Sequence, residues 1–378
     1  MLAQNQYYSY NLGELPEGCQ ACVKGEKLVL FTTGLCPRRC YFCPVSDEKF
    51  NHDITFANER RVESPQDIIT EAQLMDAKGA GITGGDPLMK LDRTLTAIKD
   101  LKHKFGASFH IHLYTSLNMI TEKNLQQLFN AGLDEIRFHL DLESKQFWPK
   151  LTLARKFSWK IGVEIPMIPT KEAEIKELMG FIQDKVDFLN LNELEVADNS
   201  QSKLGEMGFR TKHSLSYAVK ESLETGKRFL QNLQEQRYTL PVHLCTAKLK
   251  DAVQLSNRIK RESTRVKKRF DLVTSEGVLI RGALYLPELA PGFGYRKKLE
   301  SISKPVYLNK LEPVFIAVKA SLKLKDDEIF LDPAKPRILI SRNHLKKHKA
   351  FLKKLGLRPA IVMEYPTADQ FEVEIEFI

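Results

Sequence analysis

The stretch GLCPRRCYFCP, residues 34–44, contains Cys36, Cys40 and Cys43, which are half of the six cysteines in the 378-residue chain. A structural zinc site usually has four ligands from two paired motifs, and a ferredoxin-type cluster is also held by four cysteines. Three cysteines separated by three and then two residues instead leave one iron of a four-iron, four-sulfur (4Fe-4S) cluster without a protein ligand. Such an iron can bind and reduce a small molecule, so the spacing favours an open cluster over a structural zinc.

Short apolar runs alternate with amphipathic stretches around this loop. The expected strands are residues 27–34, 80–85, 109–115, 135–141, 159–168 and 186–194, and the cysteine loop directly follows the first of them. Helices are expected between the strands, for example at 64–79, with Ser64 as N-cap, Pro65 in the first turn and Gly79 at the end. Regular alternation predicts a parallel sheet, and six units are fewer than the eight of a closed barrel. We therefore expect an α/β fold, a partial (β/α)6 TIM-like barrel, with its site at the carboxyl ends of the strands.

The pattern changes after residue 200. We expect a long helix at 213–236, a short strand at 240–245 and a basic helix at 249–269. Further strands are expected at 270–275, 278–287, 313–320, 337–341, 360–366 and 371–378, with a Ser-Glu-Gly turn at 275–277. The predicted regions are an N-terminal segment with a Cys-x2-Cys pair at 1–27, the partial barrel at 28–200, a helical, basic connecting region at 201–268 and a smaller C-terminal α+β domain at 269–378.

The Cys-x3-Cys-x2-Cys loop after a first strand, with the aromatic Phe42 before the last cysteine, resembles the radical S-adenosylmethionine (radical SAM) superfamily over about residues 26–200. The resemblance implies that Cys36, Cys40 and Cys43 hold a 4Fe-4S cluster whose open iron binds S-adenosylmethionine (SAM). It further implies that an electron, from a donor such as ferredoxin or flavodoxin, cleaves SAM and releases a 5′-deoxyadenosyl radical. The arrangement, including residues 31–46 and 191–195, is similar to archaeal-type proteins related to pyruvate formate-lyase activating enzyme.

The segment TGGDPL, residues 83–88, ends the second expected strand and resembles the Gly-Gly-Glu-Pro type motif of the same superfamily. Gly84 and Gly85 would expose backbone carbonyls that accept hydrogen bonds from an ammonium group, because glycine has no Cβ to cover them. Asp86 stands where glutamate is commoner and keeps the carboxylate. A simple Gly-Gly turn is the alternative interpretation.

Other candidate cofactor-binding residues follow the later strands. Thr115 and Ser116 end the third strand and would bind the ribose or the methionine carboxylate of SAM. Arg137, His139 and Asp141 share one side of the fourth strand, because side chains alternate along a strand. Glu164, on the fifth strand, is expected to face the barrel interior. For each of these side chains, a structural hydrogen bond is an equally good interpretation.

The remaining cysteines suggest a second metal site. Cys19 and Cys22 form a Cys-x2-Cys pair before the first strand, and Cys245 lies two residues after His243. These four residues match zinc with Cys3His ligation, or an auxiliary iron–sulfur cluster that uses the three cysteines. Three unrelated thiols are the alternative.

Basic residues are unevenly distributed in a chain with a formal charge of +9 and a pI of about 9.0. Residues 248–269 hold nine Lys or Arg against two acidic residues, and a second basic cluster covers 342–354. Solvated helix faces are one explanation, and a polyanionic partner is the other. We expect a radical SAM enzyme that modifies RNA, in particular tRNA. The alternative is an enzyme that acts on a protein or peptide, including glycyl-radical activation, or on a small metabolite. A metal-binding protein without activity would leave the open iron unexplained.

The sequence shows no sign of a membrane location. Its longest apolar runs are too short to span a bilayer, and the first 18 residues lack the basic and apolar regions of a signal peptide. We therefore expect a cytoplasmic enzyme, in which clustered cysteines stay reduced and serve metal or redox chemistry.

Overall fold

The computed structural model describes residues 2–378 and divides the chain into two compact units, Met1–Arg258 (unit 1) and Ile259–Ile378 (unit 2). Each unit has its own sheet and its own hydrophobic core. The predicted region boundaries at 27, 200 and 268 stay predictions. Among residues 2–378, no helix is both long enough and apolar enough to cross a lipid bilayer.

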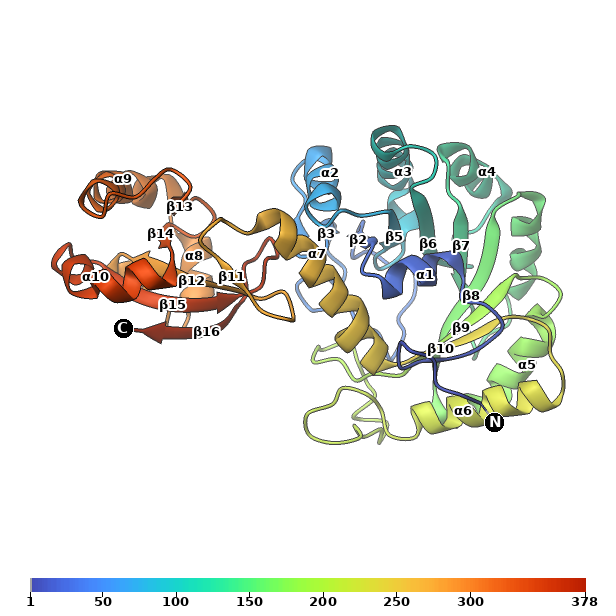
Figure 1. Ribbon diagram of the computed structural model, residues 1–378. Helices are drawn as coiled ribbons and strands as arrows, with labels where there is room; N and C mark the ends of the chain where they lie inside the picture. The colour runs from blue at the N-terminus through green and yellow to red at the C-terminus, as the bar shows by residue number, and fades with distance from the viewer. Residues whose placement is uncertain (1) are drawn as a thin grey trace. The chain divides into compact units, whose positions relative to one another are not determined.

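Unit 1 contains a ten-stranded sheet in the order β1-β10-β9-β8-β7-β6-β5-β2-β3-β4 (Figure 1). Neighbouring strands from β2 through β5 to β10 are parallel, whereas β1 and β3 are antiparallel edge neighbours. The strands are β1 Tyr10–Leu12, β2 Lys27–Phe31, β3 Phe56–Ala57, β4 Arg60–Arg61, β5 Gly79–Thr83, β6 His110–Ser116, β7 Glu135–His139, β8 Lys160–Met167, β9 Phe188–Glu193 and β10 Val242–Cys245. The expected α/β fold with a partial, open TIM-like barrel is therefore confirmed.

The parallel sheet has one strand more than the six that we expected. The short strand predicted at 240–245 is β10, which pairs in parallel with β9 and so belongs to the barrel sheet. The helix expected at 213–236 forms only as α6, Ser222–Glu235, and provides the crossover between β9 and β10. Residues 195–221 precede it as a long irregular segment. Within it, backbone bonds from residues 217–220 to residues 194–196 and 210–212 take the place of helical bonds.

Helices cover the outer face of the sheet. Figure 1 shows α2 Pro65–Leu74, α3 Leu91–Phe105, α4 Glu122–Ala131 and α5 Glu172–Ile182 on that side, and a 3-10 helix at Trp148–Lys156 precedes β8. Apolar side chains that alternate along the strands, such as Ile111, Leu113, Ile136 and Phe138, pack with them into one core. Ser64 is the N-cap of α2 as expected, and it forms a capping box with Asp67. Gly79 does not close this helix, which ends at Leu74; Gly79 is the first residue of β5.

The inner face of the same strands is polar, and the short helix α1, Glu17–Val23, lies against it (Figure 1). The backbone N–H of Gly18 points to Glu135, at 3.4 Å from the carboxylate oxygen. A Cβ at Gly18 would lie 2.5 Å from Arg137 and 2.7 Å from the ring of His112. A larger residue at this position would have to displace these side chains, because the helix backbone packs directly on polar side chains of β6 and β7.

Unit 2 is an α+β unit with an antiparallel sheet in the order β13-β14-β12-β15-β16, in which β11 also pairs with β12. Its strands are β11 Leu272–Val273, β12 Leu279–Tyr285, β13 Ile329–Asp332, β14 Arg337–Ile340, β15 Arg358–Glu364 and β16 Glu372–Phe377, and its helices are α8 Tyr295–Ser301, α9 Lys304–Ser321 and α10 Arg342–Lys354. Helices α9 and α10 pack on one face, and Tyr295 of α8 packs on the other. Helix α7, Ser256–Val266, follows a π-helical turn at Leu249–Leu255 and matches the expected basic helix.

One strand prediction in this unit is wrong. Residues 313–320 belong to α9, although their β-branched and apolar side chains favour a strand. Leu311 and Val318 are the buried residues of this helix, seven positions apart, as expected for one helical face. A short apolar run does not distinguish a buried helix from a strand, and tertiary packing decides between them here.

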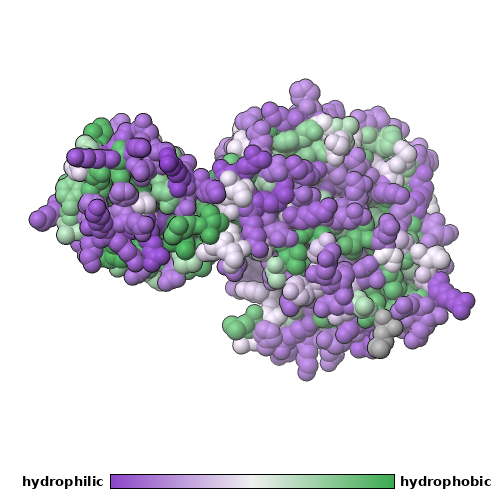
Figure 2. All heavy atoms as spheres, in the orientation of Figure 1, coloured by the Kyte–Doolittle hydropathy of each residue, from purple (hydrophilic) through white to green (hydrophobic). Residues whose placement is uncertain are grey.

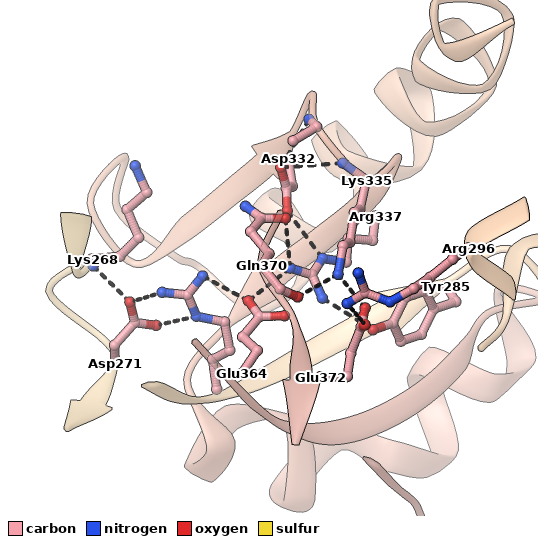
Figure 3. A network of polar contacts seen from close by, with 12 residues as sticks. Lys268, Asp271, Tyr285, Arg296, Asp332, Lys335, Arg337, Glu364, Gln370 and Glu372 are labelled. Carbon is pink, nitrogen blue, oxygen red and sulfur yellow. Dashed lines mark hydrogen bonds and ion pairs between the residues drawn. The ribbon is translucent and has the colours of Figure 1, made fainter. Parts of the chain in front are cut away.

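The face of this sheet opposite α9 and α10 contains a buried ionic network (Figure 3). Arg337 donates to Glu364 at 2.7 Å and to Asp332 at 3.0 Å, and Arg281 donates to Glu364 at 3.1 Å and to Asp271 at 2.9 Å. Buried charges are tolerated only when paired in this way. The two arginines therefore connect the four strands β12, β13, β14 and β15, and Asp271 before β11, through these carboxylates.

Candidate active site

The three clustered cysteines line one cavity at the carboxyl ends of the strands. Cys36, Cys40 and Cys43 lie on the irregular loop after β2, all are free thiols, and all are partly exposed. The cavity has a volume of about 650 Å³, and its lining also includes Gly84, Gly85, Asp86, Thr115, Ser116, His139 and Glu164. Burial raises the pKa of Cys36 to about 11 and raises the pKa values of Cys40 and Cys43. These thiols are therefore protonated at neutral pH and release protons when they bind a metal.

The two glycines bring the end of β5 into contact with the cysteine loop. The N–H of Gly85 donates to the carbonyl of Thr33 at 2.7 Å, and the N–H of Asp86 donates to the carbonyl of Leu35 at 2.8 Å. A Cβ would lie 2.5 Å from the Thr33 oxygen at Gly84 and 2.4 Å from the Leu35 oxygen at Gly85. Real Cβ atoms do not approach an oxygen so closely. Glycine is therefore required at both positions for this contact, whatever their carbonyls bind.

Asp86 is hydrogen-bonded to two other predicted site residues, Thr115 and Ser116. Its carboxylate accepts hydrogen bonds from the hydroxyl of Thr115 at 2.8 Å, and from the hydroxyl and the N–H of Ser116 at 2.8 and 3.1 Å. It also accepts from the N–H of Leu88 at 3.0 Å. With 1% of its surface exposed, this side chain has both oxygens occupied. In this structure Asp86 therefore holds the ends of β5 and β6 together, which is a structural role.

Arg38, between the first two cysteines, connects the loop to β7. Its guanidinium donates to the backbone carbonyl of His139 at 3.2 Å and forms an ion pair with Asp141 at 2.9 Å. Burial, followed by the charge of Arg38, lowers the pKa of His139 to about 4, so its ring is neutral at pH 7. Sequence reasoning missed Arg38, and its place within the cysteine motif is the signal that could have found it.

Glu164 faces the interior, as its strand position predicts. It accepts hydrogen bonds from Arg137 at 2.8 Å, from Asn190 at 2.8 Å and from Asn192 at 2.9 Å. Burial alone would raise the pKa of Glu164, but Arg137 and the two amides outweigh it and hold the pKa below its usual range. The carboxylate is therefore ionised at the floor of the cavity. The alternation Phe-Leu-Asn-Leu-Asn in β9 was an available signal for both asparagines, because it places them on one face.

The four residues of the predicted second metal site have separate partners. Cys19 accepts from the Asn190 amide at 3.3 Å, and the ring of His243 lies 3.1 Å from the hydroxyl of Ser9. Burial raises the pKa of Cys22 to about 12 and also raises the pKa of Cys245. Within residues 2–378, no three His, Cys, Asp or Glu side chains converge on a single metal ion, either at these four residues or at Cys36, Cys40 and Cys43. This finding does not distinguish the two sites, and the second site stays a prediction.

Residues 195–221, which we call the strap, also contact the cysteine loop. The amide of Asn199 donates to the carbonyl oxygens of Cys43 at 3.0 Å and Val45 at 2.8 Å, and the N–H of Lys203 donates to Tyr41 at 2.7 Å. Apolar contacts support these bonds. Leu204 of the strap belongs to a buried cluster, and the rings of Tyr41 and Phe42, just before Cys43, pack against that cluster. No feature of the sequence predicted this contact, because it joins residues about 150 positions apart.

The parallel partial barrel and the three cysteines after its first strand together indicate one class of protein. Comparison with known sequences supports the same class. The profile described as the radical SAM superfamily matches residues 30–165. The chain is 36% identical, over 98% of its length and 94% of the relative, to a Methanocaldococcus jannaschii protein that carries the provisional name glycyl-radical enzyme activating enzyme. The chain therefore belongs to the radical SAM superfamily and is an enzyme of this class. Membership implies a 4Fe-4S cluster and SAM.

Other similarities are local or weak. The chain is 27% identical to biotin synthase of Shewanella loihica over 34% of its own length and 36% of that protein. Among solved structures, Streptococcus suis SuiB bound to its precursor peptide SuiA is 14% identical, with a TM-score of 0.43 over 67% of this chain and 58% of that chain. A likeness at this level carries no argument about substrate.

Proposed function

We propose that this enzyme reductively cleaves SAM at a 4Fe-4S cluster held by Cys36, Cys40 and Cys43. The observation that carries the proposal is that the three thiols line one cavity with the polar ends of β5 to β9. Three ligands leave one iron open, and when bound the cluster supplies the electron that converts SAM to methionine and a 5′-deoxyadenosyl radical. The cavity has room for ligands beside the thiols, since its volume is about 650 Å³.

The chain's own residues would bind and orient the cofactors. The backbone carbonyls of Gly84 and Gly85 would accept from the SAM ammonium, and Thr115 and Ser116 would present hydroxyls that Asp86 orients. Glu164, which is ionised, and His139, which is neutral, would offer acceptors to ribose hydroxyls or the adenine amine. Asp141 would act through Arg38, its ion-pair partner, to keep the cysteine loop on β7.

Anaerobic reconstitution tests this proposal. With iron, sulfide, dithionite and SAM, the wild-type protein should form 5′-deoxyadenosine, and Cys36→Ala should form none above the level of enzyme-free controls. Thr96→Ala is the control, because it truncates an exposed side chain of α3 in the same unit but outside the cavity. Cleavage retained in Cys36→Ala would refute the assignment of the cluster ligands.

For the substrate, we propose RNA, in particular tRNA. The support is the charge of unit 2, which holds 24 Lys and Arg against 15 Asp and Glu, whereas unit 1 holds 33 of each. The whole excess of +9 therefore lies outside the barrel unit, as expected of an attached polyanion-binding unit.

The second candidate is a protein substrate that receives a glycyl radical, and the name of the M. jannaschii relative favours it. Incubation of the reconstituted enzyme with SAM and either total tRNA or total protein from the source cells would distinguish the two. RNA as substrate predicts that tRNA raises the rate of 5′-deoxyadenosine formation; a glycyl-radical signal in the protein fraction, with no response to tRNA, would select the second candidate.

Two further predictions belong to this proposal. A second metal centre at Cys19, Cys22, His243 and Cys245 predicts that Cys19→Ala lowers the metal content relative to the wild type; unchanged stoichiometry would exclude it. The cytoplasmic location and a ferredoxin or flavodoxin as electron donor also stay proposals. Reduction of the cluster by each donor, measured by loss of visible absorbance, tests the latter.

A further inference from the structure

Helix α10 carries an unusual set of charges on the surface of unit 2. Its thirteen residues, Arg342–Lys354, include six Lys or Arg and no Asp or Glu. Leu345 and Leu352 are fully buried and anchor the helix on the sheet, where a Cβ at Gly282 would lie 2.9 Å from Leu345. Figure 2 shows hydrophilic residues over much of the visible surface of this unit. The anchoring fixes which sides of the helix point to solvent.

Four of these cations share one side of the helix. Arg342, Lys346, Lys349 and Lys353 are separated by four, three and four residues, which is the spacing of one helical face. The backbone of His348 is not helical and kinks α10 between Lys346 and Lys349, but both halves keep the same side buried, through Leu345 before the kink and Leu352 after it. Lys347 and Lys354 lie seven positions apart on the adjoining side. The helix is about 20 Å long at 1.5 Å per residue. Over that length, one nucleic-acid strand presents about six phosphates at 3.4 Å each.

None of these six cations forms an ion pair with an acidic residue between positions 2 and 378. Other cations of the chain differ: Arg258 pairs with Glu59, Lys250 with Glu195, and Arg269 with Asp327. The basic stretch at 248–269, which first suggested an RNA partner, is thus partly neutralised. Helix α10 instead brings these six cations together within thirteen residues.

A solvated helix face is the alternative, but it normally mixes charges of both signs. Like charges four residues apart destabilise a helix by about 0.2–0.5 kcal/mol per pair, and Arg342 in the first turn also opposes the helix dipole. No acidic residue of α10 offsets that repulsion, although Lys353 and Lys354 in its last turn interact favourably with the dipole. A polyanion bound along the face would relieve it.

We propose that the exposed face of α10 binds the phosphodiester backbone of RNA. The inference rests on RNA as the proposed substrate and assigns its binding surface. Contacts to phosphates carry no sequence information, so this surface would hold the RNA while other residues select the modified nucleotide. It would also bind single-stranded RNA of unrelated sequence.

The test is the salt dependence of binding by the full-length protein. A fluorescently labelled 20-nucleotide oligouridylate is titrated at several KCl concentrations between 50 and 200 mM, and anisotropy gives the affinity. Six phosphate contacts predict a slope of about −4 in log affinity against log salt, which is an affinity loss of about 300-fold over this range. The triple variant Lys346→Gln, Lys349→Gln, Lys353→Gln should have a slope of about −2 and bind at least tenfold more weakly at 50 mM.

The control variant is Lys304→Gln, Lys323→Gln, Lys325→Gln, which removes the same charge from exposed positions of the same unit and should keep the wild-type slope. Equal slopes for both triple variants, or binding of phosphatidylserine vesicles in place of the oligonucleotide, would overturn the proposal. Formation of 5′-deoxyadenosine without RNA is measured in parallel and should be unchanged in both variants. Its absence in the wild type would refute SAM cleavage, whereas absent RNA binding with intact cleavage would refute only the role of α10.

Discussion

The substitution Asp86→Asn distinguishes a structural carboxylate from a cofactor ligand. The two oxygens of Asp86 accept four hydrogen bonds, at 2.8 to 3.1 Å, from β6 and from the turn after β5. In asparagine one oxygen becomes an NH2 group, which faces the two donors of that side. A hydroxyl can rotate to accept from it, but a backbone N–H cannot. One charge-assisted bond is therefore lost, at about 2 kcal/mol, and the others weaken, which gives a destabilisation of about 3 kcal/mol.

Thermal unfolding of the apoprotein, followed by circular dichroism without oxygen, measures this effect. A loss of about 3 kcal/mol should lower the Tm of unit 1 by about 6 °C or more, at 2–4 °C per kcal/mol. Asp92→Asn is the control, because this exposed residue in the first turn of α3 contributes at most a fraction of a kcal/mol. If Asp86→Asn unfolded within a degree of the wild type and yet failed to bind SAM, the structural interpretation would be wrong and Asp86 would be a ligand contact.

Three further substitutions test other parts of the site. Gly85→Ala places a Cβ 2.4 Å from a carbonyl oxygen of the cysteine loop and should reduce iron incorporation to less than half, whereas Gly205→Ala, with nothing within 4 Å, should not; equal iron contents would refute the close-approach argument. Asn199→Ala removes two bonds worth about 1 kcal/mol each, so the reconstituted cluster should be lost to a chelator at least tenfold faster; an unchanged rate would mean that the strap does not hold the loop. Burial lowers the pKa of His243 to about 4 in the folded protein, whereas its pKa in the unfolded chain is about 6.5. Between these two pH values the ring therefore binds a proton more readily in the unfolded chain. As the pH drops from 6.5 to 4, this residue alone should therefore lower the free energy of unfolding by about 3 kcal/mol. In urea unfolding, His243→Asn should show a smaller decrease over this pH range than the wild type. An equal decrease would mean that other groups cause the pH dependence.

The features that local sequence could predict are those set by short-range periodicity. Alternating side chains correctly placed Glu164 on the inner face, and the cysteine spacing with the Gly-Gly-Asp segment located the cavity. Contacts between distant segments were not predictable. Asn199 and Cys43 are 156 positions apart, and neither residue type indicates the other. The strand expected at 313–320 failed for a related reason, because a short apolar run takes the conformation that its neighbours in space can pack.

Pairing of β1 with β10 has a consequence for how the chain is made. Ser9, next to β1, lies 234 positions before its partner His243, and Cys19 of α1 lies 171 positions before Asn190. At about 5–20 residues per second, these N-terminal residues emerge from the ribosome about 9 to 47 s before their partners. During that interval β1 has no strand to pair with, because its partner β10 has not been made. Pairing of β1 with β10 is thus a late event of synthesis. A chaperone that assists folding of unit 1 would act before β10 has been made.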